Sequence, residues 1–255
     1  MNILSGFADI SLAQLVVVAG VALFASVVGG LAGYGGGALM PLVLVPLIGA
    51  EPVVPIIAIS SIFTNLSRFA AYLRYADRRR AGIVVSAAAL TTVLGAYGYT
   101  RLTNAGAALV IGVMLISSVP LRRLLKRHDV KIGHTGLAAG AVGYGVVVGG
   151  TSGSGVILLS LLMASGLEGA AVIATDAVIS VVTSIIKISV FGLAGVVTVQ
   201  VLAFALLIGA IALPGTFLAK TFVERMPVHI HTAILDVVVI AGGVMMISGA
   251  VRHLL

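Results

Sequence analysis

Long apolar runs are the feature that most constrains this chain. A helix that crosses a bilayer needs about 20 apolar residues. Runs of roughly that length lie at residues 10–32, 53–75, 82–100, 105–120, 134–149, 170–191, 198–220 and 232–251. Only 9% of the 255 residues are charged, whereas a soluble domain carries about 25%. So few charges cannot cover a soluble fold, and the sequence predicts an all-α polytopic membrane protein.

The composition also excludes other classes of protein. An ordinary soluble enzyme or a disordered chain would need far more charge. The net charge of +7 does not favour a nucleic-acid partner, because in a membrane protein basic residues report topology. The chain has no cysteine, which excludes disulfides, thiol chemistry and cysteine-ligated zinc. No Lys or Arg precedes the first apolar run, so we expect no cleaved signal peptide.

Two glycine-rich stretches interrupt the apolar pattern. We call residues 33–37 the first knot and residues 149–155 the second knot. The apolar segments that follow them, 38–49 and 155–166, are too short to span a bilayer. Each knot is therefore either a tight turn between two helices or part of a broken hairpin that enters the membrane. In a hairpin, the free backbone groups must bind protein, water or a ligand.

The two knots belong to an internal repeat. Gly33, Gly36 and Glu51 recur at the same spacing as Gly150, Gly153 and Glu168, and the order of long and short runs recurs with them. We interpret the two glutamates as first-turn residues that match the helix dipole. The sequence thus predicts a first membrane repeat at 1–120, a basic cytoplasmic linker at 121–133 and a second membrane repeat at 134–255.

The distribution of charge predicts how the repeats lie in the membrane. Basic residues mark cytoplasmic loops, and they cluster in the loops at 76–81, 121–133 and 220–228, whereas loop 192–197 has none. This fits two inverted repeats, each with a Gly-rich re-entrant helical hairpin plus three spanning helices. Both termini then face the outer, periplasmic side. Inverted repeats with broken helices are typical of secondary transporters.

Polar residues follow one face of the long helix after each knot. The two sets share a 4-3-4 spacing and comprise Ser61, Asn65, Arg68 and Tyr72, and Asp176, Ser180, Thr183 and Lys187. This spacing places each set on a single stripe. Arg68 and Lys187 could instead snorkel to the interface, and the hydroxyls could serve helix packing. Asp176 is either an ion-pair anchor or a group that faces a cavity, because acids at such depth need a partner.

Together these features predict a site for a small anion. Helix N-termini at glycine-rich turns attract anions, and an arginine fork matches an oxyanion. We expect the substrate site to comprise Tyr34, Gly35, Gly36, Gly37, Ser61, Asn65, Arg68, Thr151, Ser152, Gly153, Ser154, Ser180 and Lys187. Asp176 is the candidate proton-coupling group, since a buried carboxyl can exchange between charged and neutral forms. We expect no catalytic residue, metal or cofactor.

The letters GYGGGALMP at 33–41 resemble the Gly-x-Gly-Gly-Gly…Pro signature of the sulfite exporter TauE/SafE family, also called toluene-sulfonate uptake permeases. The stretch from Gly49 to Ser61, the duplicated layout and the basic central loop resemble that family too. The second knot departs from its pattern: the letters TSGSG at 151–155 replace glycines, as a specificity feature or a variant turn. The resemblance implies an inner-membrane transporter of sulfite, sulfonates or related small sulfur-containing anions.

Two other functions remain open at the level of the sequence. An anion channel could line its pore with the same hydroxyls and backbone groups. An intramembrane serine protease is suggested only by the Gly-x-Ser-Gly pattern around Ser152, whose nucleophile would need a base within hydrogen-bond reach. The histidines all lie in predicted loops or near helix ends, at His128, His134, His229, His231 and His253. Their position disfavours a protease, and inverted halves with broken helices favour alternating access over a fixed pore.

Overall fold

The computed structural model describes residues 3–32, 36–127, 131–223 and 228–254, and these residues form helices joined by short turns. The helices are η1 (Ile3–Phe7), α1 (Leu12–Ala32), α2 (Gly36–Ile48), α3 (Val53–Tyr72), η2 (Leu73–Tyr75), α4 (Arg78–Tyr99), α5 (Asn104–Arg127), α6 (His134–Gly150), α7 (Gly155–Ala164), α8 (Ala170–Leu193), α9 (Val199–Val223) and α10 (Val228–Leu254). The predicted all-α fold is therefore confirmed. Within the described residues, 5 helices are long and apolar enough to cross a membrane, namely α1, α3, α4, α5 and α8.

The helices match the predicted apolar runs except for a few residues at their ends. The largest difference is at α5, which continues to Arg127, so the first part of the predicted linker 121–133 is helical. Leucine, arginine and lysine are strong helix formers, and they dominate this stretch. The helix therefore extends beyond its apolar part.

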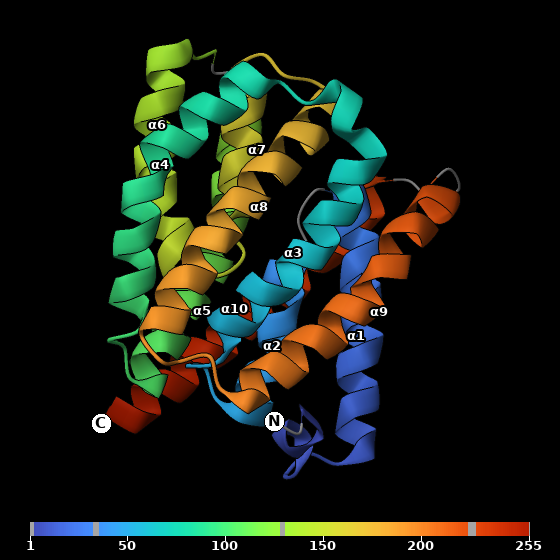
Figure 1. Cartoon of the computed structure of the whole chain (residues 1–255), viewed down its shortest axis with the longest axis vertical. Coiled ribbons are helices and arrows are strands. Elements are labelled where there is room, and N and C mark those ends of the chain that lie inside the picture. Colours follow the sequence, from blue (N-terminus) through green and yellow to red (C-terminus); the bar gives the residue numbers. More distant parts are fainter. Residues whose placement is uncertain (1–2, 33–35, 128–130, 224–227, 255) are drawn as a thin grey trace.

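The two short helices α2 and α7 begin at the knots, near the middle of the molecule, and run toward opposite ends (Figure 1). Helix α4 links those two ends. Near its start, the Arg80 guanidinium donates to the Ser165 carbonyl, just after α7 (2.8 Å). At its end, the Tyr99 hydroxyl donates to the Ala50 carbonyl, just after α2 (2.6 Å). The 22 residues of α4 span about 33 Å, so the half-helices leave the centre in opposite directions.

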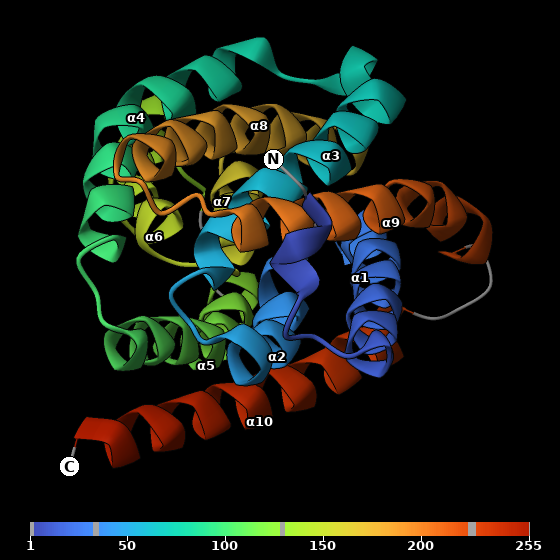
Figure 2. The same ribbon diagram turned by 60° about the horizontal axis from the view of Figure 1, so that its bottom comes forward.

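The packing of the helices follows the predicted duplication. Helix α4 packs on α6 and α8, whereas α9, its counterpart in the second half, packs on α1 and α3. Helices α3 and α8 pack on each other, and so do α5 and α10; Figure 2 shows α10 along the edge of the molecule, beside α5. If each helix is replaced by its counterpart in the other half, the pairings of α4 become those of α9. The α3–α8 and α5–α10 pairings stay the same. In Figure 1, α4 starts at the upper end and α9 at the lower end. This supports the inversion, which stays a prediction.

Basic residues gather at the end of the molecule where α4 starts, which is the upper end in Figure 1. The exposed Arg78 and Arg79 start α4 there, and Asp77 caps this helix by accepting a hydrogen bond from the Arg80 backbone N–H (2.9 Å). That hydrogen bond is the main cause that lowers the pKa of Asp77. The exposed Lys131 lies at the same end, because the neighbouring backbone is hydrogen-bonded to the end of α7. The predicted cytoplasmic loops 76–81 and 121–133 thus share one end.

Small residues form the closest helix contact, between α4 and α6. A Cβ atom at Gly145 would lie 2.6 Å from the Ala88 carbonyl oxygen, and one at Gly95 would lie 2.9 Å from the Gly150 nitrogen. Such seams let two backbones approach inside a membrane, where packing rather than water exclusion holds helices together. Gly145 and Gly150 of α6 are therefore packing residues, and Gly150 is also part of the second knot.

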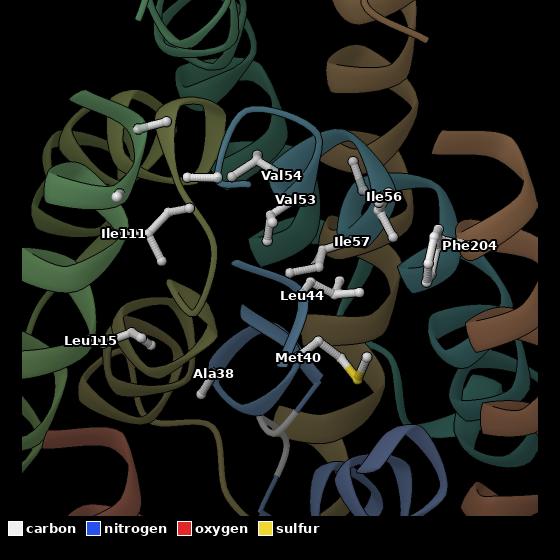
Figure 3. Packing of buried hydrophobic residues seen from close by; sticks show 14 of the residues in the cluster. Ala38, Met40, Leu44, Val53, Val54, Ile56, Ile57, Ile111, Leu115 and Phe204 are labelled. Carbon is white, nitrogen blue, oxygen red and sulfur yellow. The ribbon is translucent and has the colours of Figure 1, made fainter. Parts of the chain in front are cut away.

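An apolar core supports α2. Figure 3 shows Met40 and Leu44 of α2 beside Ile57 of α3, with Ile111 and Leu115 of α5 nearby. All five side chains are buried in one hydrophobic cluster. Burial of this kind stabilises a helix too short to span the bilayer, and it holds the start of α2, at Gly36 and Gly37, near the centre of the molecule.

We predict that Gly145→Ala destabilises the α4–α6 seam, because its methyl group would meet the backbone of α4. Overpacking of this kind costs about 1–3 kcal/mol. Gly143→Ala is the matched control, since a Cβ there has no neighbour within 4 Å and alanine favours a helix over glycine by about 0.5–1 kcal/mol. Thermal unfolding in detergent, followed by circular dichroism, should show a lower Tm for Gly145→Ala only. Equal Tm values would contradict the proposed seam.

Candidate functional site

A cavity of about 150 Å³ lies where the two knots meet. Its walls come from α1, α2, α3, α6, α8 and α9, with the second knot between α6 and α7. A cavity of about 150 Å³ can hold one benzene-sized molecule. The space therefore suits a single small ligand rather than a peptide or a lipid.

Direct backbone contact between the knots forms one side of the cavity. A Cβ atom at Gly37 would lie 2.8 Å from the Gly153 nitrogen, which is closer than atoms can approach. Gly153 itself has a φ of 85°, a conformation that glycine adopts without strain. Both positions thus require glycine, one for space and one for conformation. The contact brings the N-termini of α2 and α7 to the same cavity.

An ion pair crosses the cavity between the two halves of the chain. The Arg68 Nη1 atom of α3 lies 3.3 Å from the Asp176 Oδ2 atom of α8. The Arg68 side chain is 11% exposed and that of Asp176 is 2% exposed. Arg68 also donates through Nη2 to the Asn65 side chain. Because both charged side chains line the cavity, Arg68 does not snorkel to the membrane interface.

Lys187 is the second cation of the cavity and is only 4% exposed. Its Nζ atom donates to the Thr151 carbonyl oxygen (3.3 Å), at the C-terminal cap of α6. A cation at this position complements the partial negative charge of a helix C-terminus. Lys187 therefore holds the start of the second knot while it contributes positive charge to the cavity.

Two buried polar atoms in the cavity wall have no hydrogen-bond partner among the described residues. They are the Ser152 Oγ atom in the second knot and the Asp176 Oδ1 atom. Buried polar atoms are nearly always hydrogen-bonded, and each exception needs an explanation. A ligand, water or proton in the cavity would satisfy them.

The structure brings together the predicted site residues that it describes. The cavity is lined by Gly36, Gly37, Ser61, Asn65, Arg68, Thr151, Ser152, Gly153, Ser154, Asp176, Ser180, Thr183 and Lys187. Tyr34 and Gly35 lie outside the described residues. Tyr72, the last member of the first stripe, is not among the lining residues. Shared location supports a common site, but the role of each residue stays a prediction.

Other lining residues were not predicted from the sequence. Ser184 lines the cavity, and its Oγ atom lies 2.9 Å from that of Ser61, across the interface between α3 and α8. It follows Ser180 by one helical turn, so a slightly wider stripe would have included it. Tyr144 of α6 also lines the cavity, but no spacing in the sequence singles it out.

The lining suits a small anion with some apolar surface. Arg68 and Lys187 outnumber Asp176, and the N-termini of α2 and α7 add partial positive charge. Met40, Ile57 and Ile208 form apolar parts of the wall. Among the described residues, no group of three acidic or histidine side chains could hold a metal ion. The described lining also has no histidine that could serve as a base for Ser152.

We predict that Gly37→Ala disrupts the contact between the knots, because its methyl group would overlap the Gly153 backbone. Gly36→Ala is the matched control for stability, since a Cβ there has no neighbour within 4 Å. Gly37→Ala should lower the free energy of unfolding by about 1–3 kcal/mol, measured by thermal unfolding in detergent, whereas Gly36→Ala should not lower it. If Gly37→Ala is as stable as the control, the knots are not in contact.

Comparison with known proteins identifies the family. The model of the family described as sulfite exporter TauE/SafE matches residues 18–246, which include the cavity and both knots. Neither a curated protein nor a solved structure matches the chain. Members of this family are membrane transporters, so the chain is a transporter and not an enzyme, and Ser152 is not a protease nucleophile. The chain is a multi-pass membrane protein that belongs to the sulfite exporter TauE/SafE family.

Proposed function

We propose that the protein is a secondary transporter that moves a small sulfur-containing anion, such as sulfite or a sulfonate, across the inner membrane by alternating access. One observation carries this proposal. Two half-helix N-termini and two cations, the buried Lys187 and the mostly buried Arg68, converge on one small cavity that holds a single carboxylate among its described lining residues. The family match supports the sulfur chemistry of the anion.

The cavity offers an oxyanion several donors at once. The first backbone N–H groups of a helix have no partner within the helix, and in α2 and α7 they lie at the cavity. The Ser152 hydroxyl, which has no hydrogen-bond partner in the described part of the chain, adds a donor. Arg68 can bind two oxygens through the edge of its guanidinium group. An anion that sheds its water here exchanges those hydrogen bonds for stronger, charge-assisted ones.

Alternating access is the mechanism that the inverted repeats favour. Polar contacts at the cavity centre join one half to the other, through Ser61 and Ser184 and through Arg68 and Asp176. Away from the cavity the halves also pack through apolar clusters, each of which contains residues from both halves. Transport would rock one repeat against the other around the bound anion, with the packing between the helices of the two halves changing as they move. Asp176 is the candidate group for proton coupling, since an acid buried at this depth points to a proton or ion pathway.

We predict that Arg68→Ala weakens anion binding by at least about tenfold, or 1.4 kcal/mol, because it removes the planar donor of the cavity. Arg101→Ala is the matched control, since Arg101 is exposed and stacks on Tyr97 away from the cavity. Sulfite and methanesulfonate binding to the purified protein, followed by isothermal titration calorimetry, measures the effect. The double variant Arg68→Ala/Asp176→Asn gives the same readout without an unpaired acid, should the single variant unfold.

Transport assays in proteoliposomes separate the candidate mechanisms. An alternating-access carrier should saturate with external anion and exchange labelled anion across the membrane. An anion channel would instead conduct in electrical recordings at rates that do not saturate in the same way. Wild-type anion affinity in Arg68→Ala would contradict the proposed site.

We also predict the orientation of the chain in the membrane. Single cysteines can report it without background, because the chain has no native cysteine. Lys131→Cys should react with a membrane-impermeant maleimide only from the cytoplasmic side, and Arg101→Cys only from the periplasmic side. Both positions are exposed and lie at opposite ends of α5, which starts at Asn104 and ends at Arg127. Labelling of Lys131→Cys from the periplasm would reverse the proposed topology.

A further inference from the structure

We propose that the transported anion and Asp176 compete for Arg68, so that an anion bound at Arg68 and a proton bound at Asp176 cross the membrane together. The inference rests on the proposed function and extends it from the presence of a coupling group to the way coupling works. It starts from the ion pair between Arg68 and Asp176, which lies inside the cavity and joins the two halves.

The ion pair has the geometry of an exchangeable contact. One nitrogen of Arg68 meets one oxygen of Asp176 at 3.3 Å, whereas the other terminal nitrogen donates to Asn65. Asp176 Oδ1 has no partner among the described residues. An arginine binds a carboxylate most strongly through two parallel hydrogen bonds. An anion with two or three free oxygens can use the guanidinium edge better than Asp176 does.

Among the described residues of the elements that pack on α8, no other cation is placed to replace Arg68. Helix α8 packs against α3, α4, α6, α7 and η2. Lys187 lies three turns further along α8, about 16 Å at 1.5 Å per residue, and it donates to the Thr151 carbonyl. Arg80 of α4 is paired with Asp77 at the start of that helix, where Arg78 and Arg79 are exposed.

The remaining neighbours of Asp176 carry no positive charge toward it. Helix α6 contributes Tyr144, which is not a cation, and α7 has no titratable residue. Arg74 of η2 is exposed and stacks on Tyr75. If an anion takes Arg68, Asp176 is left as a buried carboxylate without a counter-charge. Such a group becomes neutral rather than stay charged in an apolar environment.

The coupled step therefore balances in charge. The anion binds to the Arg68 guanidinium, which keeps its proton and its charge. A proton from water on the side to which the cavity is open bonds to an oxygen of the Asp176 carboxylate. A monovalent anion thus enters with one positive charge, and the net charge of the site does not change. Because the two binding events favour each other, linkage requires that each raises the affinity for the other by the same factor.

The test uses methanesulfonate, a strong-acid anion that keeps one negative charge over the whole pH range of the assay. In wild type, where Asp176 is ionised in the empty site, binding should weaken by up to about tenfold per unit rise in pH. Asp176→Asn is permanently neutral, so its binding should not depend on pH. Asp236→Asn is the matched control, because Asp236 is also buried but is not among the cavity-lining residues.

Transport gives a second, independent readout. In proteoliposomes with a potassium-clamped membrane potential, the rate of methanesulfonate uptake by wild type should depend on the pH gradient and not on the potential. Uptake by Asp176→Asn should follow the potential, because the anion now crosses without a proton. A pH dye in weak buffer should also record about one proton taken up per anion bound by wild type, which tests the proposal even if Asp176→Asn fails to fold.

The outcomes distinguish this inference from the proposed function. If wild type binds neither methanesulfonate nor sulfite at any pH, the proposed function fails and the inference fails with it. If wild type binds methanesulfonate without pH dependence, or if Asp176→Asn keeps the wild-type pH dependence, the inference alone is overturned. Binding without proton uptake has the same consequence.

Discussion

The contact between the two glycine knots is the constraint on which the site depends. Gly37 and Gly153 let two backbones touch at the centre of the molecule, and any side chain at Gly37 would separate them. Because of this contact, the N-termini of the short helices α2 and α7 face the same cavity. It also joins the first half of the chain to the second. The candidate binding site and an interface between the halves therefore lie at the same place, as in other transporters with inverted repeats.

Charge is scarce in this chain, and most of it lies at the ends of the helices. Arg68, Asp176 and Lys187 lie within the helices instead, and all three line the cavity. Asp176 and Lys187 are buried, and the Arg68 side chain is only 11% exposed. One oxygen of Asp176 has no hydrogen-bond partner among the described residues. A buried polar atom left in this state lowers stability, which supports the proposed binding role of the cavity.

Much of the fold and of the site could be predicted from the sequence. Apolar runs marked the helices because a bilayer demands a fixed length of apolar residues. The 4-3-4 spacing selected Asn65, Arg68 and Asp176 because helical periodicity alone decides which residues share a face. The spacing could not find Ser184 and Tyr144 as lining residues, because their place depends on how helices pack. The end of α5 was missed for another reason: its last turns are basic, and helix propensity extends past the apolar run.

What the sequence by itself determined is the class of protein, the order of long and short helices, the duplication of the knots and the residues that share each polar face. These are local properties, set by hydrophobicity and by the 3.6-residue period of a helix. Only the tertiary structure decided that the two stripes face each other, that Arg68 pairs with Asp176 and that Lys187 binds the end of α6. Such pairings depend on side-chain contacts between residues more than 30 positions apart, and no local spacing encodes them.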